Sequence, residues 1–281
     1  VVVLFCGSAV ETPWLDKVRA VLYMGLPGQA GGEAAANLLT GKVNPSGKLT
    51  ETWPMRYADV PSRDTFGEKT THYKEGLYVG YRYYDKVGVP VQFAFGHGLS
   101  YTQFTYSNLQ VDGYTVQVTV TNTGSYAGAE VVQLYIAPPQ DSIYRPLKEL
   151  EGFDKVMLEP GESKTVTFVL DDRSFAVWAG GWKIPAGSYG VLVGAASDDI
   201  RLQGSLEGEG EKLPAPAWQE GSWYETLQGL PTDDEFEVLC GSELQTDPPI
   251  EKGKFTMEHS TMELKEHSFV MMQMFKGTEN T

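Results

Sequence analysis

The sequence is poor in cysteine, in basic residues and in long apolar runs. Its 281 residues include only two cysteines, Cys6 and Cys240. They are too few for a disulfide framework, and their spacing fits no zinc motif. No stretch approaches the roughly 18–20 apolar residues that a membrane-spanning helix needs. Lys and Arg total 22 against 37 Asp and Glu, for a net charge of −15. Nucleic acids and anionic membranes bind basic patches, so we expect neither as a partner.

The excess of acidic residues is concentrated near the C-terminus. From Ser205 onward we count sixteen Asp or Glu against five Lys or Arg. We interpret this segment as a solvated acidic surface that favours solubility. The sequence leaves open a homodimer.

The chain opens on an apolar run, Val1 to Cys6, that lacks the basic flank of a signal peptide. We interpret the run as a buried parallel strand. A chain that opens on a core strand is expected to be part of a longer protein. Few cysteines and no leader pattern slightly favour a cytoplasmic bacterial protein.

Residues 1–104 alternate strand and helix signals, which predicts a parallel sheet with helices on its faces. Thr12 and Pro13 fit the N-cap and first position of a short helix, and Gly41 fits a helix end. The expected elements are a strand over 1–6, a helix over 12–18, a strand over 20–23 and a helix over 33–39.

A glycine-bearing turn at 27–32 joins the second strand to the second helix. It is neither G-x-G-x-x-G nor a lysine-containing P-loop, so close helix–sheet packing is favoured over nucleotide binding. His72, His259 and His267 have no metal-ligand spacing. We therefore expect no cofactor and no metal ion.

Residues 105–208 change to a period of two. Val116, Val118 and Val120 alternate with polar residues, and further apolar runs are separated by Pro- and Gly-bearing turns. This spacing predicts an antiparallel, immunoglobulin-like β-sandwich. Its expected core includes Val118, Val132, Leu134, Phe168 and Val191.

Residues 209–281 are expected to form an acidic linker and a helical tail. Prolines make 213–217 extended. Thr232 and Glu235 form a capping-box pattern, which predicts a short helix that ends at Gly241.

A second capping-box pattern, Ser260 with Glu263, predicts a last helix that continues through Lys276. The segment from Met257 holds five of the eight methionines. Methionine fills irregular gaps in cores, so a buried helix is favoured over a partner-binding groove.

Several motifs in the first block resemble those of one known family. Tyr73 to Asp85 is rich in tyrosine and glycine, and it is followed by Phe95-Gly96-His97-Gly98-Leu99-Ser100-Tyr101-Thr102 with Phe104. Together with 27–32 and 44–49, these residues resemble the second half of family 3 glycoside hydrolases, the β-glucosidase and β-xylosidase group.

The second block carries the same resemblance in the right order. Residues 128–135, 145–153 and 160–163 are similar to the fibronectin type III-like domain that ends many family 3 enzymes. The resemblance implies an α/β sandwich domain, incomplete here, over 1–104 and the fibronectin type III-like domain over 105–208.

The resemblance also implies what this chain lacks. In that family the nucleophilic Asp lies on a preceding barrel domain, and the acid/base Glu usually lies early in the α/β domain. This chain is expected to begin after both, and hence to have no catalytic residue. The implied partners are the barrel of the same polypeptide and a β-linked oligosaccharide or aryl glycoside.

Glycoside hydrolysis needs two carboxylates about 5–5.5 Å apart for retention, or roughly 6.5–9.5 Å for inversion. The carboxylates that we considered are Glu11, Asp16, Glu33, Glu75 and Asp85. Glu11 lies in a strand-to-helix loop, where active-site residues of open α/β sheets gather. By the resemblance, however, it follows the expected acid/base.

Glu75 and Asp85 bracket Arg82 and are expected to form an ion-pair network with it. An arginine lowers the pKa of a paired carboxyl, which suits a structural anchor rather than an acid. His97 has no Ser or Cys partner at a catalytic spacing, so a hydrogen-bonded turn or core histidine is expected.

Seven aromatic residues lie between Tyr73 and Phe95, too many for a solvated linker. We expect them to pack with the segment up to Phe104 as the junction of the first two blocks, with Arg82 paired there.

Two functions remain open. The first is the C-terminal segment of a β-glycosidase, most simply a β-glucosidase, which lacks the nucleophile and acid/base and serves as a structural wall of the sugar site. The second is a non-enzymatic β-sandwich module that binds carbohydrate or protein. Trp178 and Trp182, which flank Gly180 and Gly181, are its best aromatic pair, although the resemblance implies a structural turn there.

Overall fold

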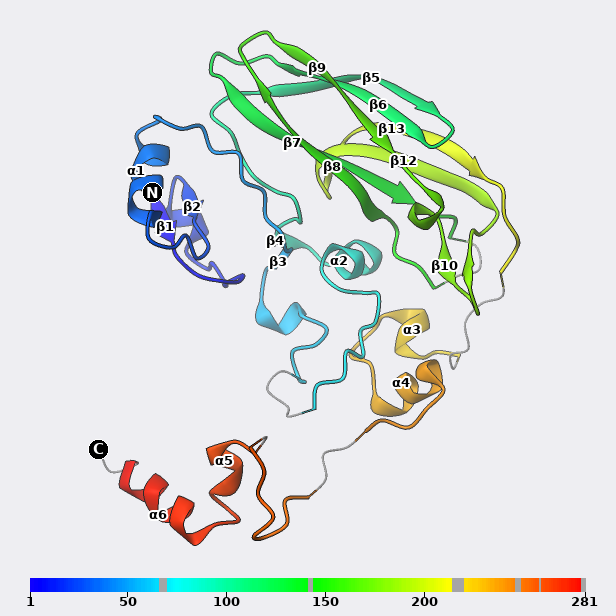
Figure 1. The fold of residues 1–281 in the computed structure, drawn as a ribbon. Coiled ribbons are helices and arrows are strands. Elements are labelled where there is room, and N and C mark those ends of the chain that lie inside the picture. Colours follow the sequence, from blue (N-terminus) through cyan, green and yellow to red (C-terminus); the bar gives the residue numbers. More distant parts are fainter. Residues whose placement is uncertain (66–69, 141–143, 214–219, 246–248, 258, 279–281) are drawn as a thin grey trace.

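A computed structural model describes residues 1–281 except 66–69, 141–143, 214–219, 246–248, 258 and 279–281 (Figure 1). A β-sandwich dominates the molecule. The first hundred residues form a small α/β unit at one end and a helix beneath the sandwich, and among the described residues four further helices follow the last strand. The expected order, α/β followed by all-β, is therefore found.

The α/β unit begins with a parallel pair of strands. β1 (Val2–Leu4) pairs with β2 (Val21–Tyr23) in parallel register, and α1 (Gly31–Leu39) follows. Both strands are only half-buried along their whole length, which corrects the expected buried strand. Parallel strands are usually covered on both faces, so this pair lacks part of its usual cover.

The helix expected over 12–18 is shorter than predicted. Only a 3₁₀ turn, η1 (Leu15–Lys17), forms, and Trp14 occupies its N-cap position. The Thr12 hydroxyl is buried without a hydrogen-bond partner, and instead the Thr12 carbonyl accepts from the Leu15 amide. Three residues cannot propagate a helix whose nucleation is costly.

The chain then crosses beneath the sandwich. β3 (Trp53–Pro54) and β4 (Val91–Phe93) form a short antiparallel ladder, with η2 (Tyr57–Asp59) and α2 (Tyr81–Val87) between them. α2 is bounded by Gly80 at φ 58° and Gly88 at φ 68°, where a side chain would strain the backbone. Figure 1 places α2 between the sandwich and the later helices.

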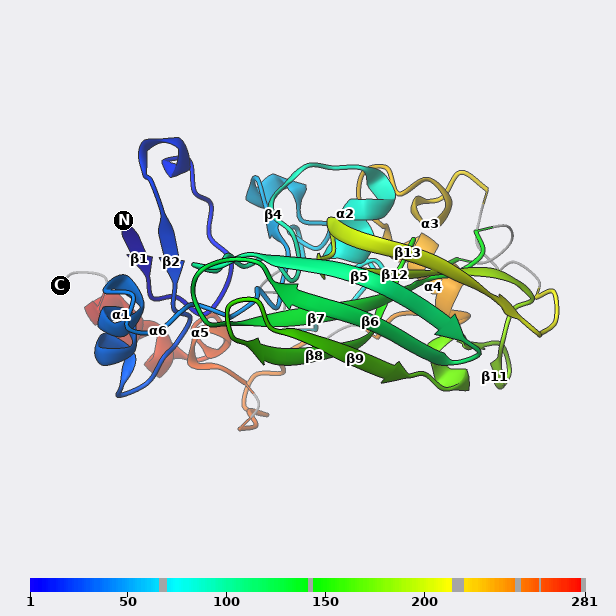
Figure 2. The same ribbon diagram turned by 90° about the horizontal axis from the view of Figure 1, so that it is seen from above.

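The sandwich has two antiparallel sheets (Figure 2). One has the order β5-β6-β9 and the other β13-β12-β7-β8. Their bounds are β5 Phe104–Asp112, β6 Thr115–Asn122, β7 Gly128–Ala137, β8 Glu149–Leu158, β9 Ser163–Val169, β12 Gly187–Ala196 and β13 Asp199–Gly208.

The predicted sandwich core is confirmed. Along β6, buried and partly exposed residues alternate strictly, as one buried face requires. The five residues named from the sequence all lie in one buried cluster, at 0% exposure except Phe168 at 8%. The immunoglobulin-like sandwich is therefore set by period-two patterning.

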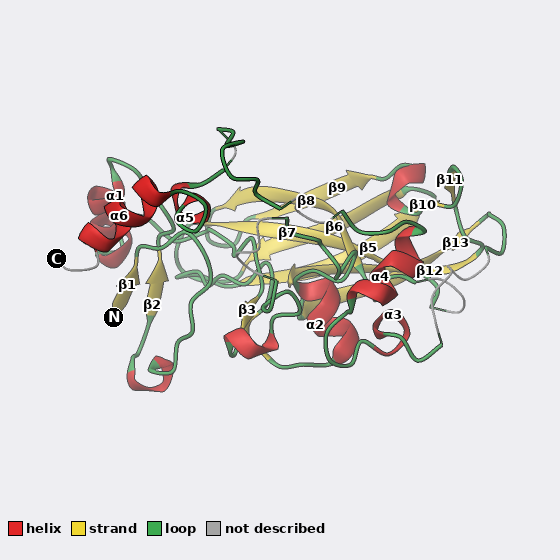
Figure 3. Ribbon diagram, turned by 90° about the horizontal axis from the view of Figure 1, so that it is seen from below, coloured by secondary structure: helices red, strands yellow, loops and turns green. Residues whose placement is uncertain are grey.

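A short hairpin projects from the end of the sandwich that is remote from β1 and β2 (Figures 2 and 3). It pairs β10 (Val177–Trp178) with β11 (Trp182–Lys183), and η3 (Asp172–Ser174) precedes it.

After the sandwich, the chain returns to α2. α3 (Trp223–Thr226) packs its aromatic residues against Tyr83 and Tyr78 of the first block. α4 (Asp233–Cys240) has the predicted capping box between Thr232 and Glu235 and ends at Gly241. The proline-bearing linker over 213–217 lies largely outside the described residues.

The last predicted helix is broken in two. The capping box at Ser260 is confirmed, but α5 covers only Thr261–Leu264 and α6 covers Phe269–Thr278. The Ser268 carbonyl accepts from Met272, and serine favours a helix start over a helix interior. The methionines are not buried core: Met262 is 61% and Met274 62% exposed. None of the helices in the described ranges is long and apolar enough to cross a membrane.

Candidate functional site

The resemblance motifs meet where two backbone segments cross. The Leu49 amide donates to the His97 carbonyl and the Gly96 amide to the Leu49 carbonyl, each at 2.8 Å. A Cβ on Gly98 would collide with the carbonyl oxygen of Gly47, and one on Gly96 with the Gln133 side chain. Glycine is required because nothing larger fits the crossing.

Asn44 fastens the same crossing to the sandwich. Its Oδ1 accepts from the Tyr101 amide at 2.8 Å and from the Ser100 hydroxyl at 3.0 Å, while its Nδ2 donates to the Ala127 carbonyl at 3.0 Å. One side chain thus joins three segments, which explains why an asparagine stands there.

Beside the crossing lies a polar groove of about 480 Å³. Lys48 donates to the Gly98 carbonyl at 2.9 Å and pairs with Glu130 at 3.0 Å, with the two side chains 13% and 7% exposed. Because of this ion pair, the Glu130 carboxylate is not available to a substrate. Tyr106 also lines the groove, and burial raises the pKa of its hydroxyl.

His97 lies at the same groove, where its imidazole stacks on a neighbouring aromatic ring. Its ring is 5.2 Å from that of Phe93, at 27° between the planes. Burial lowers the pKa of the imidazole, which favours the neutral form. The expected turn position is found, since its amide donates to the Ala94 carbonyl.

The predicted aromatic junction is found in part: Tyr73, the first of the seven aromatic residues, is 75% exposed, whereas Tyr78, Tyr81, Tyr83 and Tyr84 are buried. The Tyr81 ring lies 5.1 Å from that of Phe95 and 5.8 Å from that of Tyr135 in β7. The Tyr81 hydroxyl accepts from the Leu150 amide at 2.8 Å. Burial raises its pKa, as expected of a phenol removed from water. Helix α2 is thereby joined to β7 and β8 of the sandwich.

The predicted network of Arg82 with Glu75 and Asp85 is wrong. Arg82 pairs instead with Glu149 of β8, at 3.5 Å from Nε to Oε1. Asp85 pairs with Lys148 at 2.5 Å, and burial raises rather than lowers the pKa of its carboxyl. The partners of Arg82 and Asp85 are Glu149 and Lys148, more than sixty positions away in the sequence, so local spacing misled the prediction.

Sequence reasoning missed the most buried arginine, Arg145, whose side chain is 5% exposed. It donates to the Phe175 carbonyl and to Glu149, each at 3.0 Å. Burial raises the pKa of the neighbouring Glu151 to about 7, and the charge of Glu149 adds to this. The arginine occurs in the resembling segment 145–153, which was the one available signal.

Three of the considered carboxylates lie on the surface of the α/β unit. Glu11 is exposed and accepts from the Tyr57 amide at 2.5 Å. Asp16 and Glu33 are exposed in the first turns of η1 and α1.

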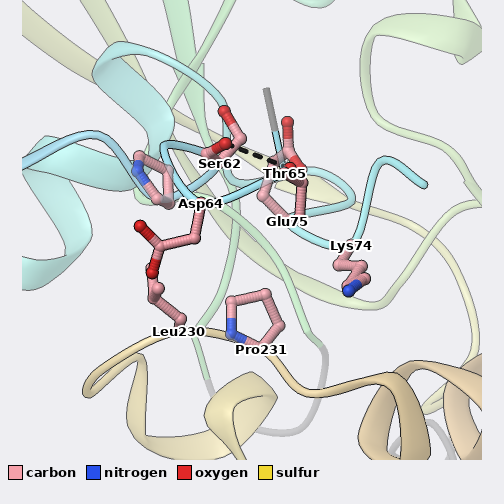
Figure 4. Close-up of a pocket in the computed structure, with 8 residues that line it drawn as sticks. Ser62, Asp64, Thr65, Lys74, Glu75, Leu230 and Pro231 are labelled. Atoms are coloured by element: carbon pink, nitrogen blue, oxygen red, sulfur yellow. Dashed lines mark hydrogen bonds between the residues drawn. The ribbon is translucent and has the colours of Figure 1, made fainter. Parts of the chain in front are cut away.

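Glu75 is buried, at 7% exposure, in the wall of a pocket of about 180 Å³ (Figure 4). Lys74, Asp64 and Leu230 also line the pocket, and Lys74 forms an ion pair with Asp233 of α4. The pocket therefore lies at the contact between the first block and the helical tail.

Within the part of the chain that the structure describes, no three side chains of the metal-ligating types come together as a site. The ionisable groups at the crossing are engaged in pairs that hold segments together. The arrangement suits a scaffold. Of the three carboxylates that line the groove, Glu130 pairs with Lys48 and Asp199 pairs with Arg201, and the third is Asp198.

Comparison with known proteins assigns both main regions. Residues 1–101 match the Glycosyl hydrolase family 3 C-terminal domain, and residues 130–197 match the Fibronectin type III-like domain. These ranges contain the crossing, the aromatic junction and most of the sandwich.

The chain is 51% identical over 219 residues to thermostable beta-glucosidase B of Acetivibrio thermocellus, covering 73% of this chain and 29% of that protein. It is 42% identical over 237 residues to an exo-alpha-(1->6)-L-arabinopyranosidase of Bifidobacterium breve, covering 79% and 31%. The chain thus spans about a third of the length of these relatives.

Solved structures agree. The GH3 beta-glucosidase of Bifidobacterium adolescentis matches with a TM-score of 0.71 and 43% identity, over 74% of this chain and 32% of that one. Beta-glucosidase 3B of Thermotoga neapolitana in complex with glycerol matches with a TM-score of 0.70 and 44% identity, over 74% and 31%. The chain accordingly belongs to glycoside hydrolase family 3, of which it carries the C-terminal part.

Proposed function

We propose that this chain is the non-catalytic C-terminal part of a β-glucosidase, which completes the α/β domain and forms a structural wall beside the sugar site. The observation that carries the proposal is the parallel pair β1–β2, which has no buried residue. Around it Val1 is 74%, Phe5 54% and Leu26 81% exposed. Parallel strands with this apolar surface need further cover.

The barrel and the first part of the α/β domain of the same polypeptide are the proposed cover. Relatives of which this chain matches 29% and 31% support this, since most of each relative lies outside the match. The substrate of the complete protein would be a β-linked glucoside. If the chain were a binding module that acts alone, residues 1–60 would have no role, and their apolar surface would stay half-covered.

The proposal is tested by restoring the missing part. The segment of the Acetivibrio thermocellus relative that precedes the matched region is fused to this chain, and hydrolysis of an aryl β-glucoside is measured. We expect turnover by the fusion and a higher melting temperature than that of the chain alone. A well-folded fusion that does not turn over the substrate would contradict the proposal.

Two exposed residues give a matched control within the fusion. Leu26, 81% exposed, lies beside β2, whereas Val169, 79% exposed, lies on β9 of the sandwich. Leu26→Asp is expected to lower the melting temperature of the fusion, because it buries a charge at the new contact. Val169→Asp is expected to leave it unchanged. Equal effects would show that the β1–β2 surface is not covered.

A further inference from the structure

The hairpin β10–β11 presents two tryptophans to solvent. Trp178 is 67% exposed and Trp182 is 52% exposed. They face each other across the strand pair, with ring centroids 5.4 Å apart and planes at 72°. Tryptophan is rarely left in water without a reason, and two adjacent ones indicate a contact surface.

The pair is held in place from one side. The Arg173 guanidinium lies 3.4 Å from the centroid of the Trp182 ring. This cation–π contact fixes the ring and covers one of its faces. Trp182 and Arg173 therefore act as a support. The edge-to-face contact with Trp182 leaves most of Trp178 open.

The tip of the hairpin does not obstruct the rings. Gly180 and Gly181 form the turn, and a Cβ at either position would meet nothing within 4 Å. An extended, flat ligand can therefore pass over the Trp178 ring.

The rim of the pair is polar and carries charges of both signs. Residues 171–183 contain two acidic and two basic side chains, and Lys183 pairs with Glu211 at 2.7 Å while both stay partly exposed. With Glu211 the rim holds three acidic and two basic side chains, and this lack of a basic excess disfavours a nucleic acid or an acidic peptide and favours an uncharged ligand.

We propose that the Trp178–Trp182 hairpin is a binding platform for a β-linked glucan chain. The C–H groups of a pyranose ring would stack on Trp178, and its hydroxyls would hydrogen-bond Arg173, Lys183 and Glu211. The platform lies at the end of the molecule remote from the β1–β2 pair (Figures 2 and 3). It does not rest on the proposed function, because it needs no catalytic partner.

The full 281-residue chain is titrated with cellohexaose by calorimetry and by NMR of the indole N–H signals. We expect weak, saturable binding that shifts two indole signals, and a loss of at least about tenfold in affinity in Trp178→Ala. Phe153→Ala is the matched control, since Phe153 is 69% exposed on β8. It is expected to bind as the unchanged chain does.

Thermal melts confirm that each variant is folded, and Trp178→Phe, which keeps an aromatic face, is expected to bind within a few-fold of the unchanged chain. No saturable binding by the unchanged chain, or equal binding by Trp178→Ala, would overturn the proposal. Sedimentation that reveals a dimer lost in Trp178→Ala, without sugar binding, would identify a second copy as the occupant and would also overturn it.

Discussion

Arg145 and Glu149 form a largely buried ion pair, with 3.0 Å between Nη2 and Oε2. The same carboxylate lies 3.5 Å from Arg82 of α2, so one acidic side chain connects the sandwich to the helix beneath it. The two arginines differ in burial, at 5% and 37% exposure of the side chain. This difference makes the energetics of the junction testable.

Arg145→Ala is expected to lower the free energy of unfolding by about 3–5 kcal/mol, because it removes the buried guanidinium that donates to both Glu149 and the Phe175 carbonyl. Arg82→Ala is expected to cost less than about 1 kcal/mol, since its pair is longer and its side chain is 37% exposed. Urea denaturation of both variants measures the difference. A loss in Arg145→Ala no larger than that in Arg82→Ala would contradict the assignment of Arg145 as the main partner of Glu149.

Gly98→Ala is expected to destabilise the protein by about 2–4 kcal/mol, because the new methyl group would meet the Gly47 carbonyl. Gly47→Ala is the matched control. A Cβ there meets nothing within 4 Å, so we expect a change within about 0.5 kcal/mol. Thermal melts of both variants measure the difference. An unchanged melting temperature for Gly98→Ala as well as for Gly47→Ala would mean that the close approach of Gly98 to Gly47 does not exist in solution.

Glu151 makes stability depend on pH. Its pKa is raised to about 7 in the folded chain by burial and by Glu149, against an ordinary value of 4.5. The folded state then holds the proton more tightly than the unfolded state. Its stabilising effect is complete below about pH 4.5 and is lost as the pH rises through 7.

Unfolding of Glu151→Gln at pH 5 and pH 8 measures this effect, with the unchanged chain as reference. The unchanged chain should lose about 1–2 kcal/mol more than the variant between the two pH values, once screening at this half-buried site is considered. Parallel pH profiles of the two proteins would show that the carboxyl titrates normally.

Trp223 is expected to fasten the helical tail to the first block. It is 2% exposed, and its ring lies 6.2 Å from that of Tyr83, nearly parallel to it. Trp223→Ala should lower the free energy of unfolding by about 3–5 kcal/mol. Limited proteolysis should then cleave α3 and α4 while the sandwich persists. Resistance equal to that of the unchanged chain would mean that the tail is held elsewhere.

Patterns that act over short distances predicted the structure well. The valines of β6 and the Thr232–Glu235 capping box each depend on neighbours a few residues away, and both are found as expected. The aromatic junction was also predictable, because residues such as Tyr81 are too apolar to remain in a linker.

The predictions that failed depended on distant partners. Asp85 pairs with Lys148, which is 63 positions away in the sequence, and not with the nearby Arg82. β1 is half-buried and α6 is exposed because few distant residues pack against them. The periodicity of a local sequence does not indicate whether such packing partners are present. The role of Arg145 required the Phe175 carbonyl, thirty positions away.

The most direct test of the account is the activity of the 281-residue chain by itself on an aryl β-glucoside. We predict no turnover above a heat-treated control, because the chain matches only about a third of the length of its relatives, and the family's paired catalytic carboxylates are expected outside that part. Clear turnover by the purified chain, abolished by Glu11→Gln or Glu75→Gln, would contradict the central claim that this part of the family is non-catalytic.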